Sequence, residues 1–217
     1  MIDHATNIVW RVDGWVQQAV RDLGWQASGA LHAVADAANW WGGTGVVLLA
    51  AALWIGGRAL KRTSLARVGL RGAEGLAVAS AVSGIIKGLA GRARPFVMPG
   101  EPWHWEFNHG WSDAQYFSMP SGHTTATMAF AVGVLVATRG SGLKSRTALV
   151  ATLLVSAGTV AFARVYSDQH WLSDVVVALL LGTTTSLLLA RVHARSTHPG
   201  YHRVMLGTAG TGTEMPK

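Results

Sequence analysis

The chain alternates long apolar stretches with short polar ones. Five stretches are apolar and long enough to be membrane helices if glycine and alanine are tolerated within them. They cover approximately residues 40–55, 68–89, 121–138, 147–163 and 171–189. The pattern predicts an all-α fold, a polytopic membrane bundle of about five spanning helices, with residues 40–194 forming the membrane domain.

Residues 1–39 show a different pattern. Apolar residues recur there at helical spacing, at Val9, Val12, Val16, Val20 and Leu23. Polar side chains occupy the other faces, so the stretch is too polar to span a bilayer. We interpret it as an amphipathic helix lying in the outer membrane interface, and a helix packed over the bundle is the alternative.

The two ends of the chain lack apolar segments. Residues Met1–His4 are not a basic region followed by an apolar core, so we expect no cleaved signal peptide. The tail 195–217 contains a run of Gly and Thr without apolar periodicity, and we expect it to be a disordered cytoplasmic tail.

Composition supports a membrane location. Hydrophobic residues make up 50% of the chain and charged residues 13%, about half the charged fraction of soluble domains. The net charge of +7 does not indicate nucleic acid, because the basic residues are not interleaved with aromatic ones on one face. Without cysteine, disulfide and thiolate chemistry are excluded.

The distribution of charge predicts the orientation of the helices. If residues 58–71 are cytoplasmic, the loop 139–146 and the tail from residue 191 are cytoplasmic too. Together with the adjacent Glu74, these regions hold 12 of the 18 basic residues and two of the 11 acidic ones. The positive-inside rule therefore assigns them to the cytoplasm. Nine of the ten tryptophans then lie toward the outer side, as expected for an aromatic belt.

Three polar clusters lie at or beside the predicted outer ends of the apolar stretches. They supply three cations, a glycine-containing turn, two imidazoles and a carboxylate. Such groups can hold a phosphate and break its ester bond. The clusters are Lys87 with Arg94-Pro95, then Pro120-Ser121-Gly122-His123, and then Arg164 with His170 and Asp174.

In the first cluster, Lys87 and Arg94 are seven residues apart, which is two helical turns. If the helix continues that far, both cations face the same way, and Arg94 before Pro95 should end it. The alternative is that Lys87 extends toward the membrane surface and Arg94 only decorates the membrane edge.

The second cluster opens the third apolar stretch. Pro120 suits a helix start, and Ser121 is expected to supply a capping hydroxyl. Gly122 lets an oxyanion approach the backbone closely, where free N–H groups form an anion site beside His123. The alternative is an ordinary capped helix with a surface histidine.

The third cluster places His170 and Asp174 four residues apart, on one face of the last predicted helix. The carboxylate can accept a hydrogen bond from one imidazole nitrogen and leave the other free to attack. Arg164, at the end of the preceding stretch, can share the bound anion. The alternative is an interfacial network of salt bridges.

Taken together, the motifs Lys87-x6-Arg94-Pro95, Pro120-Ser121-Gly122-His123 and Arg164-x5-His170-x3-Asp174 resemble the three signatures of the type 2 phosphatidic acid phosphatase (PAP2) superfamily. The resemblance covers roughly residues 87–189. One departure is Ala163, where the third motif commonly begins with Ser. The resemblance does not cover the N-terminal part, and many bacterial membrane members have six spanning helices.

The resemblance implies a role for each residue. His170 would attack phosphorus to form a phosphohistidine, Asp174 would orient it, and His123 would protonate the leaving group. The phosphate would be bound without a metal or other cofactor, by Lys87, Arg94, Arg164 and the backbone near Ser121 and Gly122.

These observations predict an integral membrane phosphatase that hydrolyses a lipid phosphate or diphosphate at the extracytoplasmic face. Candidate substrates are of the phosphatidate, phosphatidylglycerophosphate or undecaprenyl diphosphate type. Its partners are the lipid substrate and the bilayer, not nucleic acid, and we expect it in the bacterial cytoplasmic membrane. The alternatives are a lipid-to-lipid phosphotransferase using the same site, or a non-enzymatic lipid-binding or transport protein.

The loop 101–119 is rich in tryptophan and ends in Tyr116-Phe117. We expect it to rest on the outer leaflet and form one wall of a lipid entry site. Packing against the protein core is the alternative.

Overall fold

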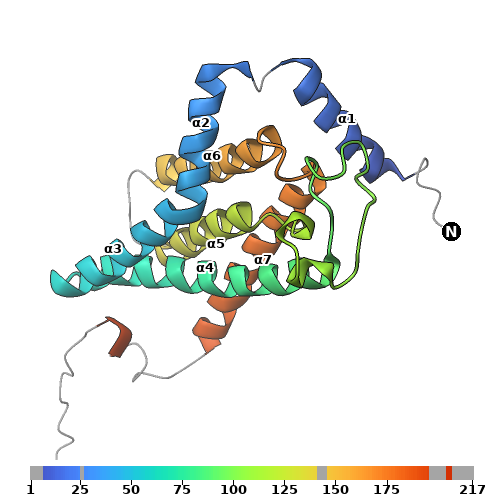
Figure 1. Ribbon diagram of the computed structural model, residues 1–217. Coiled ribbons are helices and arrows are strands. Elements are labelled where there is room, and N and C mark those ends of the chain that lie inside the picture. Colours follow the sequence, from blue (N-terminus) through green and yellow to red (C-terminus); the bar gives the residue numbers. More distant parts are fainter. Residues whose placement is uncertain (1–6, 25–26, 141–145, 196–203, 207–217) are drawn as a thin grey trace, which may run out of the picture.

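The computed structural model describes residues 7–24, 27–140, 146–195 and 204–206, and this part of the chain is a helical bundle without β-strands (Figure 1). The all-α prediction is confirmed. The α-helices are α1 (Ile8–Asp22), α2 (Gly29–Trp40), α3 (Val46–Ala59), α4 (Thr63–Ala90), α5 (Gly122–Ala137), α6 (Arg146–Tyr166) and α7 (Leu172–Arg195). A π-helical turn, η2 (Trp41–Gly45), joins α2 to α3, and two short 3-10 helices, η3 (His109–Trp111) and η4 (Ala114–Tyr116), lie in the loop before α5.

Four helical stretches in the described residues are long and apolar enough to cross a membrane, namely 29–59, 63–90, 146–166 and 172–195. The apolar helix α5, with 16 residues, is shorter. The protein is therefore a multi-pass membrane protein.

The first spanning stretch is longer than the sequence pattern predicted, because it begins at Gly29 rather than near residue 40. Polar residues such as His32, Asp36 and Asn39 hide this start, while the alanines between them favour a helix. The glycine-rich turn η2 then widens the helix, and Figure 1 shows that α2 and α3 run in different directions on its two sides.

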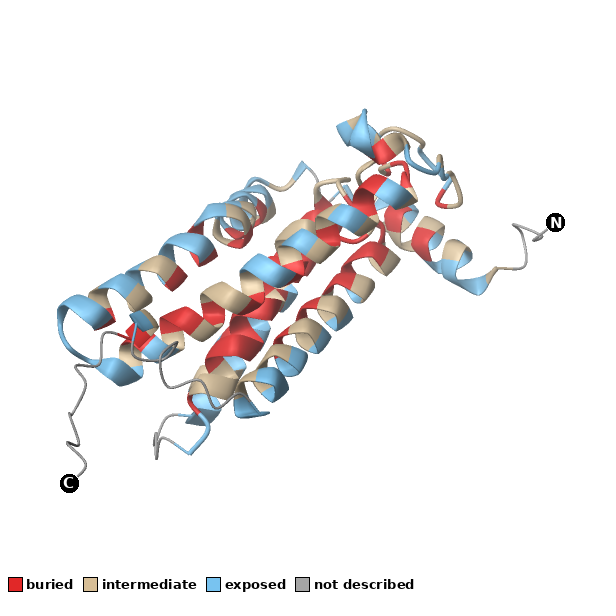
Figure 2. Cartoon of the chain, turned by 90° about the horizontal axis from the view of Figure 1, so that it is seen from below, coloured by how far each residue is buried: buried red, intermediate tan, exposed pale blue. Residues whose placement is uncertain are grey.

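Helix α5 forms the centre of the bundle and packs against α4, α6 and α7. Nearly its whole length is buried, as the red ribbon segments of Figure 2 illustrate for the inner faces of the bundle. Small residues allow this close packing. A Cβ atom on Gly182 of α7 would lie 2.7 Å from the Thr125 carbonyl oxygen of α5. Ser186 Oγ also donates a 2.8 Å hydrogen bond to the Ala129 carbonyl, a type of contact that stabilises helix pairs in lipid.

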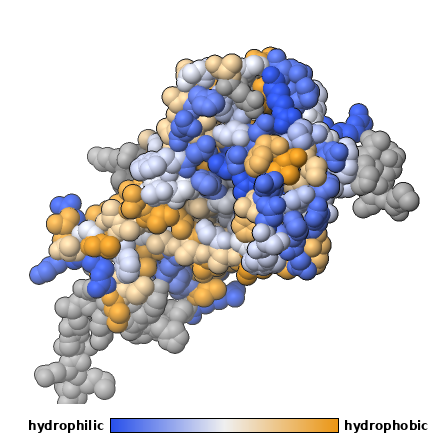
Figure 3. All heavy atoms as spheres, viewed as in Figure 1, coloured by the Kyte–Doolittle hydropathy of each residue, from blue (hydrophilic) through white to orange (hydrophobic). Residues whose placement is uncertain are grey.

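The two ends of the bundle differ in the hydropathy of their surface. Figure 3 shows hydrophobic residues gathered over α3 and α4, and hydrophilic ones over the end formed by α1 and the loop 91–121. Helices in lipid expose apolar side chains, and exposed Leu48, Ile55, Ile85 and Leu180 follow this rule.

Helix α1 packs across the ends of α6 and α7 that carry the third polar cluster. Val16 and Val20 contact Val165 and Val175. The helix therefore packs over the bundle, which was the alternative to a helix lying only in the membrane interface. Its inner face also buries two polar residues, Asp13 and Gln17. Apolar residues remain exposed on its outer side, at Ile8, Val9, Val12 and Trp15.

Most of the tail predicted to be disordered lies outside the described residues. Residues 204–206 are an exception, because they form a helical turn. Leu206 packs against Ala66 and Leu70, and Trp54 Nε1 donates a 2.8 Å hydrogen bond to the Met205 carbonyl. This part of the tail is ordered against α3 and α4.

Candidate active site

Lys87 lies near the C-terminal end of α4, where its side chain is 6% exposed. Its Nζ donates to the carbonyl oxygens of Phe117 and Ser118, at 2.7 and 3.0 Å. An ammonium has three donors, so these two bonds orient Lys87 toward the start of α5 and leave one donor. The side chain points into the protein and does not extend to the membrane surface.

Arg94 reaches the same region by a different route from the one predicted. The helix does not continue to residue 94, because α4 ends at Ala90 and Gly91 adopts a left-handed conformation with φ of 58°. That conformation ends helices and favours glycine. After this turn Arg94 Nη1 donates to the Gln169 side-chain oxygen. Burial lowers the pKa of Arg94, although an arginine remains charged at neutral pH.

Arg164, in the last turn of α6, completes a set of three cations. Gln169 Oε1 accepts from Arg164 Nη2 at 3.4 Å as well as from Arg94, and Asn39 Oδ1 accepts from Arg164 Nη1 at 3.0 Å. The buried Nε atoms of Arg94 and Arg164 have no hydrogen-bond partner in the described part of the chain. These two Nε donors are therefore left for an anion. Gln169 and Asn39 were not predicted from the sequence.

The start of α5 differs from the prediction for Ser121. Ser121 is the N-cap residue, but its hydroxyl does not cap the helix; it lies 3.0 Å from Thr124 Oγ1. Its amide donates to the Asp174 carbonyl at 3.1 Å, so that amide is not available to a ligand. The anion site is therefore reduced to the first-turn amides that follow, beginning with Gly122, which have no intrahelical acceptor.

His123 projects from this first turn toward η2. A Cβ atom on Gly43 would lie 2.9 Å from His123 Nε2, so only glycine leaves full room for the imidazole there. Lys87, Arg94 and Arg164 are all within electrostatic range of His123. The structure thus brings the three predicted clusters to one place.

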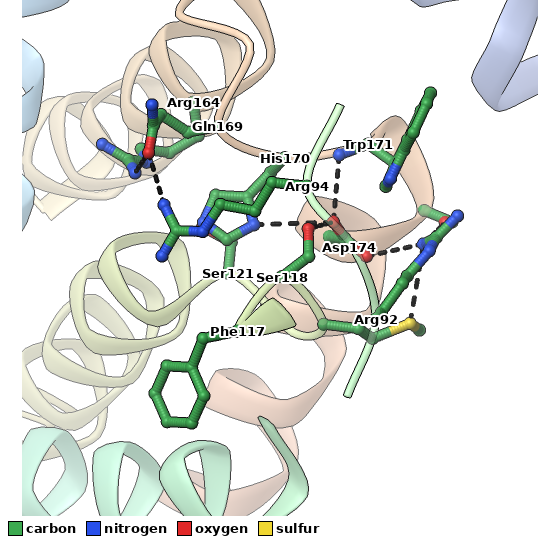
Figure 4. Close-up of polar contacts among 12 residues, drawn as sticks. Arg92, Arg94, Phe117, Ser118, Ser121, Arg164, Gln169, His170, Trp171 and Asp174 are labelled. Atoms are coloured by element: carbon green, nitrogen blue, oxygen red, sulfur yellow. Dashed lines mark hydrogen bonds and ion pairs between the residues drawn. The ribbon is translucent and has the colours of Figure 1, made fainter. Parts of the chain in front are cut away.

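His170 and Asp174 lie close together (Figure 4), but they do not share a face of one helix as predicted, because α7 begins at Leu172, two residues after His170. His170 Nδ1 lies 3.5 Å from Asp174 Oδ2, and the two side chains are 2% and 0% exposed. This contact is longer than a standard N–H···O hydrogen bond. With Nδ1 toward the carboxylate, the other ring nitrogen, Nε2, faces away from Asp174.

The pKa of His170 is lowered to about 3, first because burial disfavours the charged imidazole. The positive charges of Lys87 and Arg164 lower it further, while Asp174 opposes the shift. His170 is therefore neutral at physiological pH, and the tautomer with its proton on Nδ1, toward Asp174, leaves the Nε2 lone pair for attack.

Asp174 accepts hydrogen bonds from three further groups, which were not predicted from the sequence. Oδ2 accepts from Ser118 Oγ at 2.6 Å and from the Trp171 amide at 2.9 Å, and Oδ1 accepts from Arg92 Nη1 at 2.6 Å. Figure 4 shows Arg92 on the side of Asp174 away from Arg94 and Arg164. In the sequence, Arg92 and Arg94 suggest a single basic patch, but their side chains point to different parts of the site.

Two cavities adjoin these residues. A cleft of about 280 Å³ extends from Lys87 and His123 between α3, α4 and α5, where Val47, Leu76 and Ala126 line it. A polar cavity of about 510 Å³ borders Arg164 and Gln169 on the side of α2, where its walls include His32, Asp36 and Ser167. A larger cavity, of about 670 Å³, lies away from the site, between α1 and the loop residues 100–103.

The arrangement suits the transfer of a phosphoryl group. A neutral imidazole held by a carboxylate can act as a nucleophile, and three cations with helix N-terminal amides can stabilise a phosphate. A second imidazole, on His123, can exchange a proton with the leaving group. In the described residues no group of three or more His, Asp and Glu side chains could hold a metal ion.

Comparison with known families agrees with this geometry. The family model described as PAP2 superfamily matches residues 70–198, more than half of the chain. The matched span includes all three polar clusters and excludes α1, α2 and α3. No curated protein and no solved structure matches the chain.

Proposed function

The chain belongs to the PAP2 superfamily and crosses the membrane several times, and from this we propose that it is an integral membrane phosphatase acting on a lipid phosphate or diphosphate. The candidate substrates are those of the phosphatidate, phosphatidylglycerophosphate and undecaprenyl diphosphate type. Membership supports phosphatase chemistry, and the surroundings of the site support a lipid as the substrate.

The observation that carries the proposal is the cleft between α3, α4 and α5. At one end it contains Lys87 and His123, and along its length it is lined by apolar residues of spanning helices, such as Val47 and Leu76. A substrate with its phosphate on the cations would place its leaving group beside His123. A hydrocarbon chain then fits the apolar part of the cleft, because its surface is removed from water there.

In the first step, His170 Nε2 attacks phosphorus while Lys87, Arg94 and Arg164 bind the phosphate oxygens. A nitrogen–phosphorus bond forms and the bond to the leaving oxygen breaks, while His123 gives that oxygen a proton. The negative charge of the bound phosphate favours the protonated form of His123. The three cations supply the charge that a divalent ion would otherwise supply, so we expect activity without an added metal.

In the second step, water attacks the phosphohistidine from the side that the leaving group has vacated. His123, now neutral, takes a proton from the water, and His170 is released together with inorganic phosphate. The polar cavity beside Arg164 and Gln169 supports hydrolysis, because it offers a hydrated route for phosphate. Transfer to a second lipid would need an acceptor in the apolar cleft.

The proposed location is the bacterial cytoplasmic membrane, with the site on the extracytoplasmic side. The charge bias supports this orientation, since α3 and α5, whose ends carry Arg58 and Arg139, end on the side of the bundle opposite to the start of α7 (Figure 1).

A substrate panel tests the proposal. Purified protein in detergent with EDTA is given phosphatidate, phosphatidylglycerophosphate, undecaprenyl diphosphate and the water-soluble glycerol 3-phosphate. We expect phosphate release from at least one lipid, and preference for it over glycerol 3-phosphate by about tenfold or more in kcat/KM. Labelled phosphate recovered in a second lipid would identify a phosphotransferase, and no turnover of any lipid would contradict the proposal.

A further inference from the structure

Asp13 is a buried carboxylate on α1, in the part of the chain outside the span that matches the family. Its side chain is 1% exposed. Oδ2 accepts from Arg92 Nη2 at 2.7 Å and from Ser173 Oγ at 2.6 Å, and Oδ1 accepts from the Ser173 amide at 2.8 Å. These bonds tie α1 to the residue that directly precedes Asp174.

Arg92 lies between two carboxylates. Its Nη1 donates to Asp174 Oδ1 at 2.6 Å and its Nη2 to Asp13 Oδ2 at 2.7 Å. Nε and Nη2 also donate to the Pro102 carbonyl, at 3.1 and 2.7 Å, and Nη1 donates to Ser173 Oγ at 2.7 Å. All five donors of the guanidinium therefore have protein acceptors. In contrast to Arg94, Arg92 has no donor left for a phosphate.

We propose that Asp13 is a positioning residue for the catalytic pair His170–Asp174 and acts through Arg92. The inference rests on the proposed function, because it assigns Asp13 to the same site. It adds a requirement for α1, whose docking completes the hydrogen bonding of the carboxylate that orients the nucleophile.

The physical reason is that two anions share one buried cation. If Asp13 becomes neutral, the charge of Arg92 is left to Asp174 alone, and the guanidinium loses one of the acceptors that set its plane. Asp174 is then drawn toward Arg92 through Oδ1. The His170 Nδ1 contact on Oδ2, at 3.5 Å already the longest on that oxygen, weakens further. His170 is held less well for attack.

The surface of α1 provides a matched control. Asp22 lies on the same helix, is exposed, and has a hydrogen bond from Gln18 Nε2. Asp13→Asn and Asp22→Asn make the same chemical change, one inside the network and one outside it. Ser173→Ala gives a milder perturbation, because it removes the hydroxyl between Arg92 and Asp13 and keeps the backbone N–H bond.

The experiment measures kcat, KM and the rate of phosphoenzyme formation, and records the ¹⁵N-histidine NMR signal of His170. For Asp13→Asn we expect kcat and phosphoenzyme formation to fall together by about ten- to a hundredfold, with KM within about threefold of wild type. The His170 Nδ1 signal should shift. Asp22→Asn should match the wild type in every measurement.

A folded Asp13→Asn protein with wild-type kcat and an unchanged His170 signal would overturn the proposal. If Asp13→Asn does not fold, Ser173→Ala decides: we expect a fall in kcat without a change in KM, and an unchanged kcat overturns the inference. If the wild type has no phosphatase activity, the proposed function fails. The NMR comparison then still tests the positioning role, and an unshifted His170 signal in Asp13→Asn refutes it.

Discussion

At the scale of single residues, the site is organised by what surrounds His170. Asp174 lies on one side of the imidazole, and the cations Arg94 and Arg164 meet at Gln169 on the other (Figure 4). Burial lowers the pKa of His170. The ring therefore stays in its neutral, nucleophilic form at pH values of about 6.5, where an ordinary imidazole is partly protonated.

The protonation of His170 can be measured directly. Because its pKa is lowered to about 3, we expect His170 to stay neutral at about pH 5, where an ordinary imidazole with a pKa of about 6.5 is mostly charged. In unfolded protein the residue takes up a proton, so stability falls as the pH drops from about 6.5 toward 3. ¹⁵N-histidine NMR, assigned with His170→Ala, checks this; a midpoint near 6.5 would be inconsistent with the buried site.

Gly43 tests the position of His123. Since a Cβ atom there would lie 2.9 Å from His123 Nε2, Gly43→Ala should displace the imidazole and lower kcat by about tenfold or more. Gly56 lies in the same continuous helical stretch, and a Cβ atom on it would have no neighbouring atom within 4 Å. Gly56→Ala therefore serves as the control and should keep wild-type kcat. Equal kcat values for the two variants would show that Gly43 does not limit the room around His123.

At the scale of elements, hydropathy and charge were sufficient to predict the helices but not their ends. Gly91 ends α4 four residues before Pro95 through its left-handed conformation, and one glycine among several in this part of the chain gives little warning of this. The start of the first spanning stretch at Gly29 was hidden because its polar residues face the site, where Asn39 bonds to Arg164.

The predicted and the missed site residues differ in how far apart in the chain their contacts lie. Residues of one short motif, such as His170 and Asp174, are visible because they are only four positions apart in the chain, although His170 precedes α7. Arg92, Asp13 and Gln169 depend on contacts between elements far apart in the chain. Without tertiary structure, nothing in their spacing distinguishes them from surface residues.

The packing of α5 against α7 gives an element-scale prediction. Gly182→Val should destabilise the protein by about 1–3 kcal/mol, because its side chain would collide with the Thr125 carbonyl, 2.7 Å from the Cβ position. Gly158→Val, where the Cβ position has no atom within 4 Å, is the control. To compare the two variants, each is heated, and the loss of monodisperse protein is measured by size-exclusion chromatography. Identical melting of both variants would argue against this helix contact.

At the scale of the whole molecule, the polar clusters and the basic loops occupy opposite ends of the bundle. Helix α7 begins beside α1 at one end, and α3 and α5 end at the other (Figure 1), with Arg58 in the last turn of α3 and Arg139 just after α5. The chain is without cysteine, so single cysteines can report on each side.

Labelling of intact cells tests this orientation. Phe107, 75% exposed, lies in the loop before α5, and Leu60, 65% exposed, lies between α3 and α4. We expect a membrane-impermeant maleimide to modify Phe107→Cys in intact cells and Leu60→Cys only after lysis. The reverse result would place the candidate site in the cytoplasm.

The proposed mechanism requires that His170 carries the phosphoryl group, and this intermediate can be trapped. Purified protein is mixed with a ³²P-labelled lipid phosphate that it hydrolyses, quenched in base within one turnover, and digested for peptide mapping. We predict an acid-labile label on the peptide containing His170, and in His170→Ala no label and a fall in kcat of about a thousandfold or more. Continued phosphate release by His170→Ala would contradict the mechanism.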